Sequence, residues 1–133
     1  MKDFFELLFS QTWQGLYSSN WANPSNWNPI SVPDDTSDVI MGDPVLGGFV
    51  ALITGTTYEC HNITFVDDGR LDFASAGSRL NVFGDFDNQS NGQDVVDFAG
   101  IVHFASQTQY QQQVVGRTNF NEVLVNKPNS YPF

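Results

Sequence analysis

Cysteine, basic side chains and helix-forming residues are all scarce in this chain of 133 residues. Cys60 is the single cysteine, so no disulfide can form within the chain, and its place beside a predicted strand favours a small buried apolar residue. Five Lys and Arg oppose fifteen Asp and Glu. The resulting formal charge of −10 disfavours nucleic acid and anionic membrane surfaces as partners. No apolar run approaches the ~20 residues of a membrane-spanning helix, so we expect no membrane insertion.

What the chain does contain is a series of very short strand signals separated by turn signals. The strand runs are mostly apolar at alternate positions, the pattern of a pleated segment with one buried face. A strand and its turn take about eight to ten residues, which suits an all-β sandwich or a coiled β-solenoid. The predicted strands cover residues 39–41, 45–53, 63–65, 71–73, 80–83, 95–98, 101–104, 107–113 and 120–126, with a further short strand at Phe86.

Two features of the pattern favour the solenoid. The tetrapeptide Asp-Phe-Ala-Ser at 72–75 recurs as His-Phe-Ala-Ser at 103–106, about thirty residues on, as successive coils of a solenoid would. The segment 107–113 is rich in glutamine, and its side chains could stack in ladders along adjacent coils.

The N-terminal part is unlike the rest. Residues 1–11 combine Lys2 with an apolar run that Glu6 interrupts, so they are either the remnant of a secretory signal peptide or a cap over an open end of the core. Three prolines between residues 24 and 33 exclude a helix. Trp13, Trp21 and Trp27 lie in the same stretch. Their indoles either pack in the core, with hydrogen-bond partners for their N–H groups, or stack on sugar rings.

Three blocks, taken in order, resemble a known group of proteins. The first is the segment 13–41, with Ser-Asn-Trp at 25–27, Val-Pro at 32–33 and Asp-Val-Ile at 38–40. The second is Cys-His-Asn-Ile-Thr-Phe at 60–65, which continues to Gly-Asp-Phe-Asp-Asn at 84–88. The third is Ile-Val-His-Phe at 101–104 with Phe-Asn-Glu-Val-Leu-Val-Asn-Lys at 120–127. Over nearly all of its length after Gln11, the chain is similar to the repeating adhesin-like surface modules of Bacteroidetes proteins exported by type IX secretion.

The resemblance implies an all-β fold, a right-handed parallel β-helix with a Trp-rich N-terminal cap; the alternative is an antiparallel β-sandwich. After residues 1–11 we expect a single solenoid domain over 12–133, with a Trp- and Pro-rich lead-in over 12–41 and coils over 42–133. Members of the group continue beyond 126–127 into more coils and a sorting domain. The chain is therefore expected to be either a fragment or a short relative that caps both ends itself. An uncapped solenoid end would favour self-association.

Two groups of polar residues could carry chemistry, although the resemblance brings no catalytic residues. Asp67, Asp68 and Arg70, with His61 and Asp72 nearby, could act as the acid and base of a polysaccharide hydrolase. However, Asp-Asp-Gly is also the usual composition of a turn, and the Gly-His-Gly motif of β-helix hydrolases is missing.

The second group is Asp85, Asp87 and Asp94, which could supply oxygen ligands to a loose Ca²⁺ site. Their segment does not have the EF-hand spacing, and a coil corner that turns at Asn-Gly 91–92 is the simpler interpretation. His61 and His103 have no Cys or His partner at zinc-ligand spacing, so we expect no zinc site.

We therefore expect a non-catalytic, extracellular structural or adhesive module of the cell surface, with no cofactor unless Ca²⁺ binds, and with a glycan or other surface partner. The first alternative is a carbohydrate-binding module that uses Trp13, Trp21, Trp27 and Tyr17, with Tyr110 as a further candidate. The second is a fragment of a polysaccharide-degrading β-helix enzyme. Two or more of these aromatic side chains exposed in one plane would favour sugar binding. Convergence of Asp67, Asp68 and Arg70 on one point would favour the enzyme.

Overall fold

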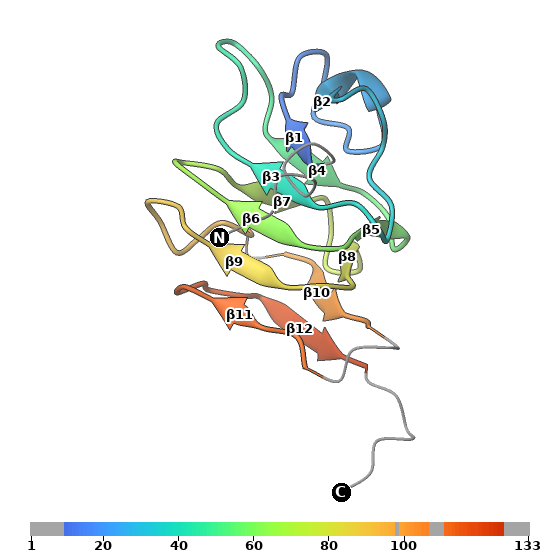
Figure 1. Ribbon diagram of the computed structural model, residues 1–133, viewed down its shortest axis with the longest axis vertical. Helices are drawn as coiled ribbons and strands as arrows, with labels where there is room; N and C mark the ends of the chain where they lie inside the picture. The colour runs from blue at the N-terminus through green and yellow to red at the C-terminus, as the bar shows by residue number, and fades with distance from the viewer. Residues whose placement is uncertain (1–9, 98, 107–110, 127–133) are drawn as a thin grey trace, which may run out of the picture.

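The computed structural model describes residues 10–97, 99–106 and 111–126, which form a stack of β coils (Figure 1). The strands are two to four residues long, and one 3-10 turn, η1 (Pro24–Asn26), interrupts them. No helix in the described part of the chain is long or apolar enough to span a membrane. The strands are β1 (Gln11–Trp13), β2 (Trp27–Asn28), β3 (Val39–Met41), β4 (Ala51–Ile53), β5 (Tyr58–Cys60), β6 (Ile63–Phe65), β7 (Leu71–Phe73), β8 (Arg79–Val82), β9 (Phe86–Asn88), β10 (Ile101–Phe104), β11 (Val114–Val115) and β12 (Glu122–Val125).

The strands line three faces of the solenoid. The first face has the order β2-β1-β3-β6-β9-β11, the second pairs β4 with β7, and the third has the order β5-β8-β10-β12. Among the described strands, β1 and β2 pair antiparallel and the other ladders are parallel. The prediction of an all-β parallel β-helix is therefore confirmed, and the antiparallel sandwich is excluded.

The register of the ladders sets the length of one coil. On the first face Ile63 lies beside Val39, 24 residues away, and Phe86 lies beside Ile63, 23 residues away. The expected repeat of about thirty residues is wrong. Phe73 belongs to the second face, beside Ile53, whereas Phe104 belongs to the third face, beside Val82. The two similar tetrapeptides therefore occupy different corners of the coil.

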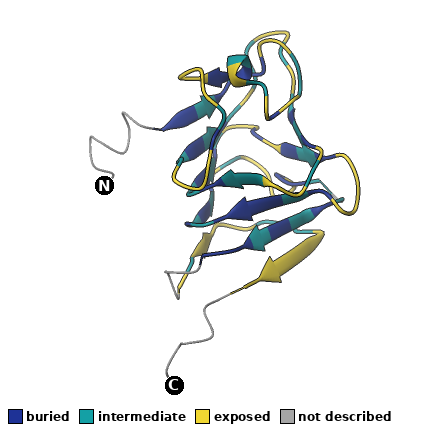
Figure 2. Ribbon diagram, turned by 90° about the vertical axis from the view of Figure 1, so that its right-hand side faces the viewer, coloured by how far each residue is buried: buried dark blue, intermediate teal, exposed yellow. Residues whose placement is uncertain are grey.

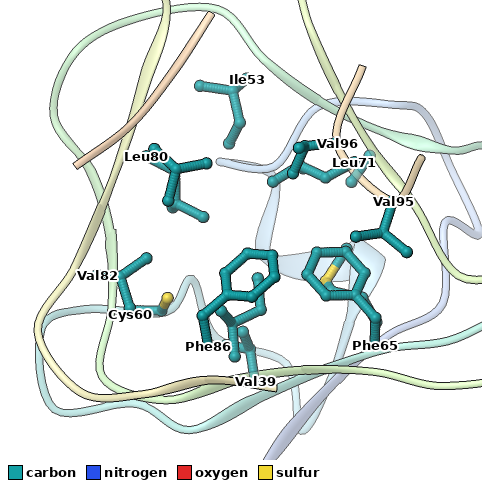
Figure 3. Close-up of a cluster of buried hydrophobic side chains, with 14 of the residues drawn as sticks. Val39, Ile53, Cys60, Phe65, Leu71, Leu80, Val82, Phe86, Val95 and Val96 are labelled. Carbon is teal, nitrogen blue, oxygen red and sulfur yellow. The ribbon is translucent and has the colours of Figure 1, made fainter. Parts of the chain in front are cut away.

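A continuous apolar core fills the bore of the solenoid. Most of the three-residue strands bury their first and last residues and leave the middle one partly exposed, as the alternation in the sequence predicts. Figure 3 shows side chains from all three faces pointing toward one another: Cys60, Leu80 and Val82 from the third, Val39, Phe65 and Phe86 from the first, and Ile53, Leu71, Val95 and Val96 from the second and its continuation. The rings of Phe65 and Phe86, from adjacent coils, have centroids 5.3 Å apart.

A polar column runs beside the first face, one residue before each strand. Asp38 Oδ1 accepts a hydrogen bond from the backbone N–H of Asn62 (3.2 Å). Asn62 Oδ1 accepts one from the N–H of Asp85 (2.7 Å), and Asp85 Oδ1 accepts one from the N–H of Gln113 (2.8 Å). Each side chain thus binds the equivalent residue of the next coil, which fixes the register of the coils at this corner.

The turn between β6 and β7 explains the Asp-Asp-Gly sequence at residues 67–69. Asp67 has a positive φ of 53°, and Gly69 donates its N–H to Val66 O (2.9 Å), so this segment is the predicted turn. A Cβ on Gly69 would lie 2.0 Å from Met41 O in the coil above, which is why the position requires glycine.

Three predicted strands differ from the observed ones. In 95–98 the described residues 95–97 form only an isolated parallel bridge, with Val96 beside Leu71. In 107–113 the described residues 111–113 form no strand, and β11 begins at Val114. Gln112 donates its Nε2 hydrogens to the carbonyl oxygens of Val82 (2.9 Å) and Gly84, so this glutamine caps backbone groups of the previous coil. In 45–53 the strand is limited to β4, because residues 45–48 form a turn in which Gly48 donates its N–H to Val45 O (2.6 Å) and Gly47 has a φ of 79°.

Replacement of Asn62 tests the polar column. We expect Asn62→Ala to lower the free energy of unfolding by about 1–3 kcal/mol, because the half-buried N–H of Asp85 loses its acceptor. Asn62→Asp keeps an acceptor oxygen, as Asp38 and Asp85 do at the same position, and should recover most of the loss when salt screens the added charge. Urea denaturation at high ionic strength measures both. Equal stability of the wild type and Asn62→Ala would contradict a stabilising role for the column.

Candidate functional site

The three tryptophans form one buried cluster at the N-terminal end of the solenoid. Their exposed fractions are 2% for Trp13, 0% for Trp21 and 1% for Trp27. The ring of Trp27 lies edge-on to both others, with centroids 5.1 Å from Trp13 and 4.7 Å from Trp21. β1 and β2 hold two of the rings, since Trp13 pairs with Trp27 across the antiparallel ladder. The cluster covers the bore above β3, as Figure 1 shows for the segment around β2 and η1.

The burial of these rings contradicts the expectation that they bind a ligand. Indoles at 0–2% exposure cannot stack on a sugar ring, so Trp13, Trp21 and Trp27 serve as packing residues. The indole N–H of Trp13 donates to Phe49 O and that of Trp27 donates to Trp21 O, both at 2.8 Å. The polar atoms of these two rings therefore have hydrogen-bond partners within the protein. Tyr17 is 67% exposed, and Tyr110 lies outside the described residues.

Asn26 organises the loop that carries the cluster. Its side chain is fully buried, and its Oδ1 accepts hydrogen bonds from the backbone N–H groups of Tyr17 (2.8 Å) and Ser18 (3.1 Å). Its Nδ2 donates to Ser18 Oγ and to Asn20 O, both at 3.0 Å. A buried amide with four partners replaces the regular ladder that this segment lacks.

Asn26→Ala should therefore destabilise the N-terminal cap. We expect the free energy of unfolding to fall by about 2–4 kcal/mol, because the N–H groups of Tyr17 and Ser18 lose their acceptor. Asn28→Ala is the matched control, since Asn28 is exposed and has no side-chain hydrogen bond within the described residues. Thermal denaturation followed by tryptophan fluorescence reports both variants. Similar losses in the two variants would argue against the role given to Asn26.

The three predicted calcium ligands do not come together. Asp85 belongs to the polar column, and Asp87, in β9, accepts a hydrogen bond from Gln89 Nε2 (2.7 Å). Both line a shallow hollow with Asn62. Asp94 lies at another corner and accepts a hydrogen bond from Asn119 Nδ2 (2.8 Å). Within the described residues, no group of three or more His, Cys, Asp and Glu side chains could hold a metal ion, so these three carboxylates do not assemble a site.

Calcium should therefore leave the stability of the protein unchanged. A site with a dissociation constant of about 0.1 mM would stabilise the fold by about 2.7 kcal/mol at about 10 mM Ca²⁺. We expect the same melting temperature in EDTA and in calcium, with magnesium at equal ionic strength as the control. A calcium-specific increase in the melting temperature that Asp85→Asn or Asp94→Asn removes would contradict this prediction and show that the carboxylates bind calcium.

The Asp67–Arg70 corner forms a shallow hollow of about 190 Å³. Asp68, Arg70 and Asp94 line it together with Ser90 and Gln93, whereas Asp67 is not among the lining residues. Two charged groups of this corner, those of Asp68 and Arg70, already have partners. Asp68 accepts a hydrogen bond from Asn91 Nδ2 (3.0 Å), and the Arg70 guanidinium donates to Asp72 Oδ1 (2.6 Å).

His61 does not join this corner. Its Nδ1 lies 3.0 Å from Asp38 Oδ1, beside the polar column. Two members of the suggested acid–base group therefore bind outside it, Asp68 to the next coil and His61 to the previous coil. Arg70 pairs with Asp72, which belongs to the group. The described geometry brings no pair of these carboxylates to a common point with the histidine.

Cys60 is enclosed in the solenoid, whereas His103 is half-buried on the outer side of β10. Cys60 is completely buried, and burial raises the pKa of its thiol, with the Asp38 and Glu59 carboxylates adding to the effect. The thiol therefore stays protonated and acts as an apolar core group, as expected. His103 donates or accepts through Nδ1 with Asn81 Oδ1 (2.8 Å). Burial, with the nearby Arg79 charge, lowers the pKa of His103, so its imidazole is neutral at pH 7.

Sequence reasoning missed the cross-coil role of the polar residues. Asp or Asn stands directly before an apolar run at 38, 62 and 85, with spacings of 24 and 23 residues. That recurrence is the signal that could have revealed the column. A scan of protein-family models, a search of curated proteins and a search of solved structures each found no match to this chain.

Proposed function

We propose that this chain is a non-catalytic, extracellular structural or adhesive module of the cell surface, of the adhesin-like β-helix kind that its three sequence blocks resemble. The observation that carries the proposal is the use of its polar side chains. Asp38, Asn62 and Asp85, which could have served chemistry, bind backbone groups of the next coil. Such links favour a rigid stack over a site whose groups are free to react.

The outer surface supports a role in contact with other molecules. The middle residues of the strands point outward and are often polar, as Thr64, Asp72 and His103 are on the three faces. Together with the net charge of −10, this surface favours a hydrated partner such as a glycan or a cell-surface protein over nucleic acid. The carbohydrate-binding alternative retains only Tyr17 among its described aromatic residues, and a single ring does not make a stacking row.

The location of the protein tests the first part of the proposal. In the cells that produce it, antibodies against the folded chain should label intact, unpermeabilised cells, and protease added outside should remove the signal. A cytoplasmic protein of the same cells is the control. Labelling that requires permeabilisation would contradict an extracellular role.

An assay of polysaccharide hydrolysis tests the second part. We expect the folded protein to release no reducing sugar from a panel of polysaccharides, and Asp68→Asn to behave like the wild type. Release that this variant abolishes would contradict a non-catalytic function, because Asp68 lines the hollow at the Asp67–Arg70 corner.

A further inference from the structure

The sequence contains a single Asn-Gly pair, Asn91 and Gly92, in the corner loop that follows β9. Residues 91–94 are all exposed, and Figure 2 shows in yellow that many of the corner loops of the stack are exposed. Asparagine is a chemically labile residue, and it reacts with the next backbone nitrogen most readily where that nitrogen belongs to glycine, which has no Cβ to hinder the approach. The loop therefore holds one candidate for a change in its own covalent structure.

The backbone nitrogen of Gly92 is open to such a reaction. Among the described residues its N–H has one acceptor, Ser90 Oγ at 3.3 Å, and a Cβ built on Gly92 would meet nothing within 4 Å. Gly92 also lines the hollow of the Asp67–Arg70 corner, so water reaches it. Its carbonyl oxygen is held, because Asn88 Nδ2 donates to it at 2.9 Å. The loop is thus anchored at the carbonyl of Gly92 and weakly held at its nitrogen.

A second pair in the same corner, Asp68 and Gly69, differs in these respects. Gly69 is buried, and its N–H donates to Val66 O at 2.9 Å. A Cβ on Gly69 would lie 2.0 Å from Met41 O, so the packed backbone leaves this glycine little room to move. Asp-Gly forms the same cyclic imide as Asn-Gly, with water as the leaving group. Asp68 is therefore an internal comparison in which the attacking nitrogen is locked.

The side chain of Asn91 links two coils. Its Nδ2 donates to Asp68 Oδ1 (3.0 Å), and its backbone N–H donates to Asp67 O (2.7 Å). Figure 1 shows the loops that follow β6 and β9 one above the other. Asp68 and Asn91 are both exposed, so water replaces the side-chain bond when it opens and no polar group is left unsatisfied. In that open state, Cγ of Asn91 is available to the nitrogen of Gly92.

We propose that Asn91 deamidates without an enzyme, through a succinimide formed with Gly92, and that the reaction breaks this link between the two coils. The nitrogen of Gly92 attacks Cγ of Asn91, the Cγ–Nδ2 bond breaks, and the proton of the Gly92 N–H leaves with Nδ2 as ammonia. Water then opens the imide at one of its two carbonyl carbons, which leaves an aspartate or an isoaspartate at position 91. Water is the sole co-reactant, and the inference does not depend on the proposed function.

Either product removes the link. A carboxylate has no N–H to donate, so Asp68 Oδ1 loses its donor and faces a second negative charge. Asp94 lines the same hollow as Asp68, so the new charge joins two carboxylates that are already present. An isoaspartate also adds a methylene group to the main chain, which shifts the carbonyl of Gly92 relative to Asn88 Nδ2. The loop after β9 is thereby loosened from the preceding coil.

Mass spectrometry of proteolytic fragments tests the site. After incubation of the folded protein at mildly alkaline pH, position 91 should carry an acid in place of the amide, and an isoaspartate-specific methyltransferase should label it. We expect a rate within about tenfold of the rate in urea, because the exposed loop opens without global unfolding. Asn81 and Asn88, both 8% exposed and not followed by glycine, are the internal controls and should keep their amides.

Gly92→Ala tests the route. The fold accommodates the added Cβ, since nothing lies within 4 Å of it, but the methyl group hinders attack by the nitrogen and should lower the rate about tenfold. An unchanged rate in Gly92→Ala would overturn the proposal. A rate in the folded wild type more than about tenfold below that in urea would do the same, because the fold would then protect Asn91 as it protects the buried asparagines.

An exchange of the two linked residues tests the loss of the link. In freshly purified protein at low ionic strength, Asn91→Asp should lower the midpoint of urea denaturation, since it sets two carboxylates against each other. Adding Asp68→Asn places an amide donor opposite a carboxylate again, with the roles exchanged, and should recover the wild-type midpoint. Equal midpoints for the wild type and Asn91→Asp would overturn the release of the link. A double variant no more stable than Asn91→Asp would also overturn it.

Discussion

The structure depends on one constraint: strands of two to four residues form only when another coil lies against them. A three-residue strand makes too few hydrogen bonds to repay the ordering of its backbone, and its inward side chains are covered only by neighbouring coils. The ladder from β3 through β6 to β9 satisfies both needs at once, because each coil supplies hydrogen bonds and a layer of core to the next. At each end of the stack the terminal coil has a neighbour on one side alone, so other residues must cover its core, and the two ends do this differently.

At the N-terminal end aromatic side chains cover the core. Trp13, Trp21 and Trp27 supply a compact apolar lid, and Asn26 supplies the hydrogen bonds that the irregular loop lacks. Along the stack the polar column of Asp38, Asn62 and Asp85 links neighbouring coils. The side-chain oxygen of each residue accepts a hydrogen bond from the backbone N–H of the next member. At the C-terminal end the described residues provide only Phe120, whose ring contacts Phe86 and Phe104 and leaves the aliphatic residues of β12 in water.

The strands were predictable because their alternation is strict and local. The runs at 39–41, 63–65 and 71–73 match β3, β6 and β7, since each buries its outer residues and exposes its middle one. The coil length was not predictable from the tetrapeptide repeat, because corners on different faces share the same turn chemistry and Phe73 and Phe104 do not stack. Residue type alone also does not decide whether an indole is buried or whether a carboxylate binds a metal or a backbone N–H. Those outcomes depend on register, which gathers residues about 23 positions apart.

Inter-strand nuclear Overhauser effects measure that register most directly. The account predicts contacts between the backbone protons of residues one coil apart, such as Ile63 with Phe86 and Val102 with Leu80, in the pattern of a parallel ladder. It also predicts slow amide exchange in β6, where both neighbours are present. Cross-strand contacts between neighbours in the sequence, such as β5 with β6 or β7 with β8 in antiparallel hairpins, would contradict the stacked coils and the roles assigned to their residues.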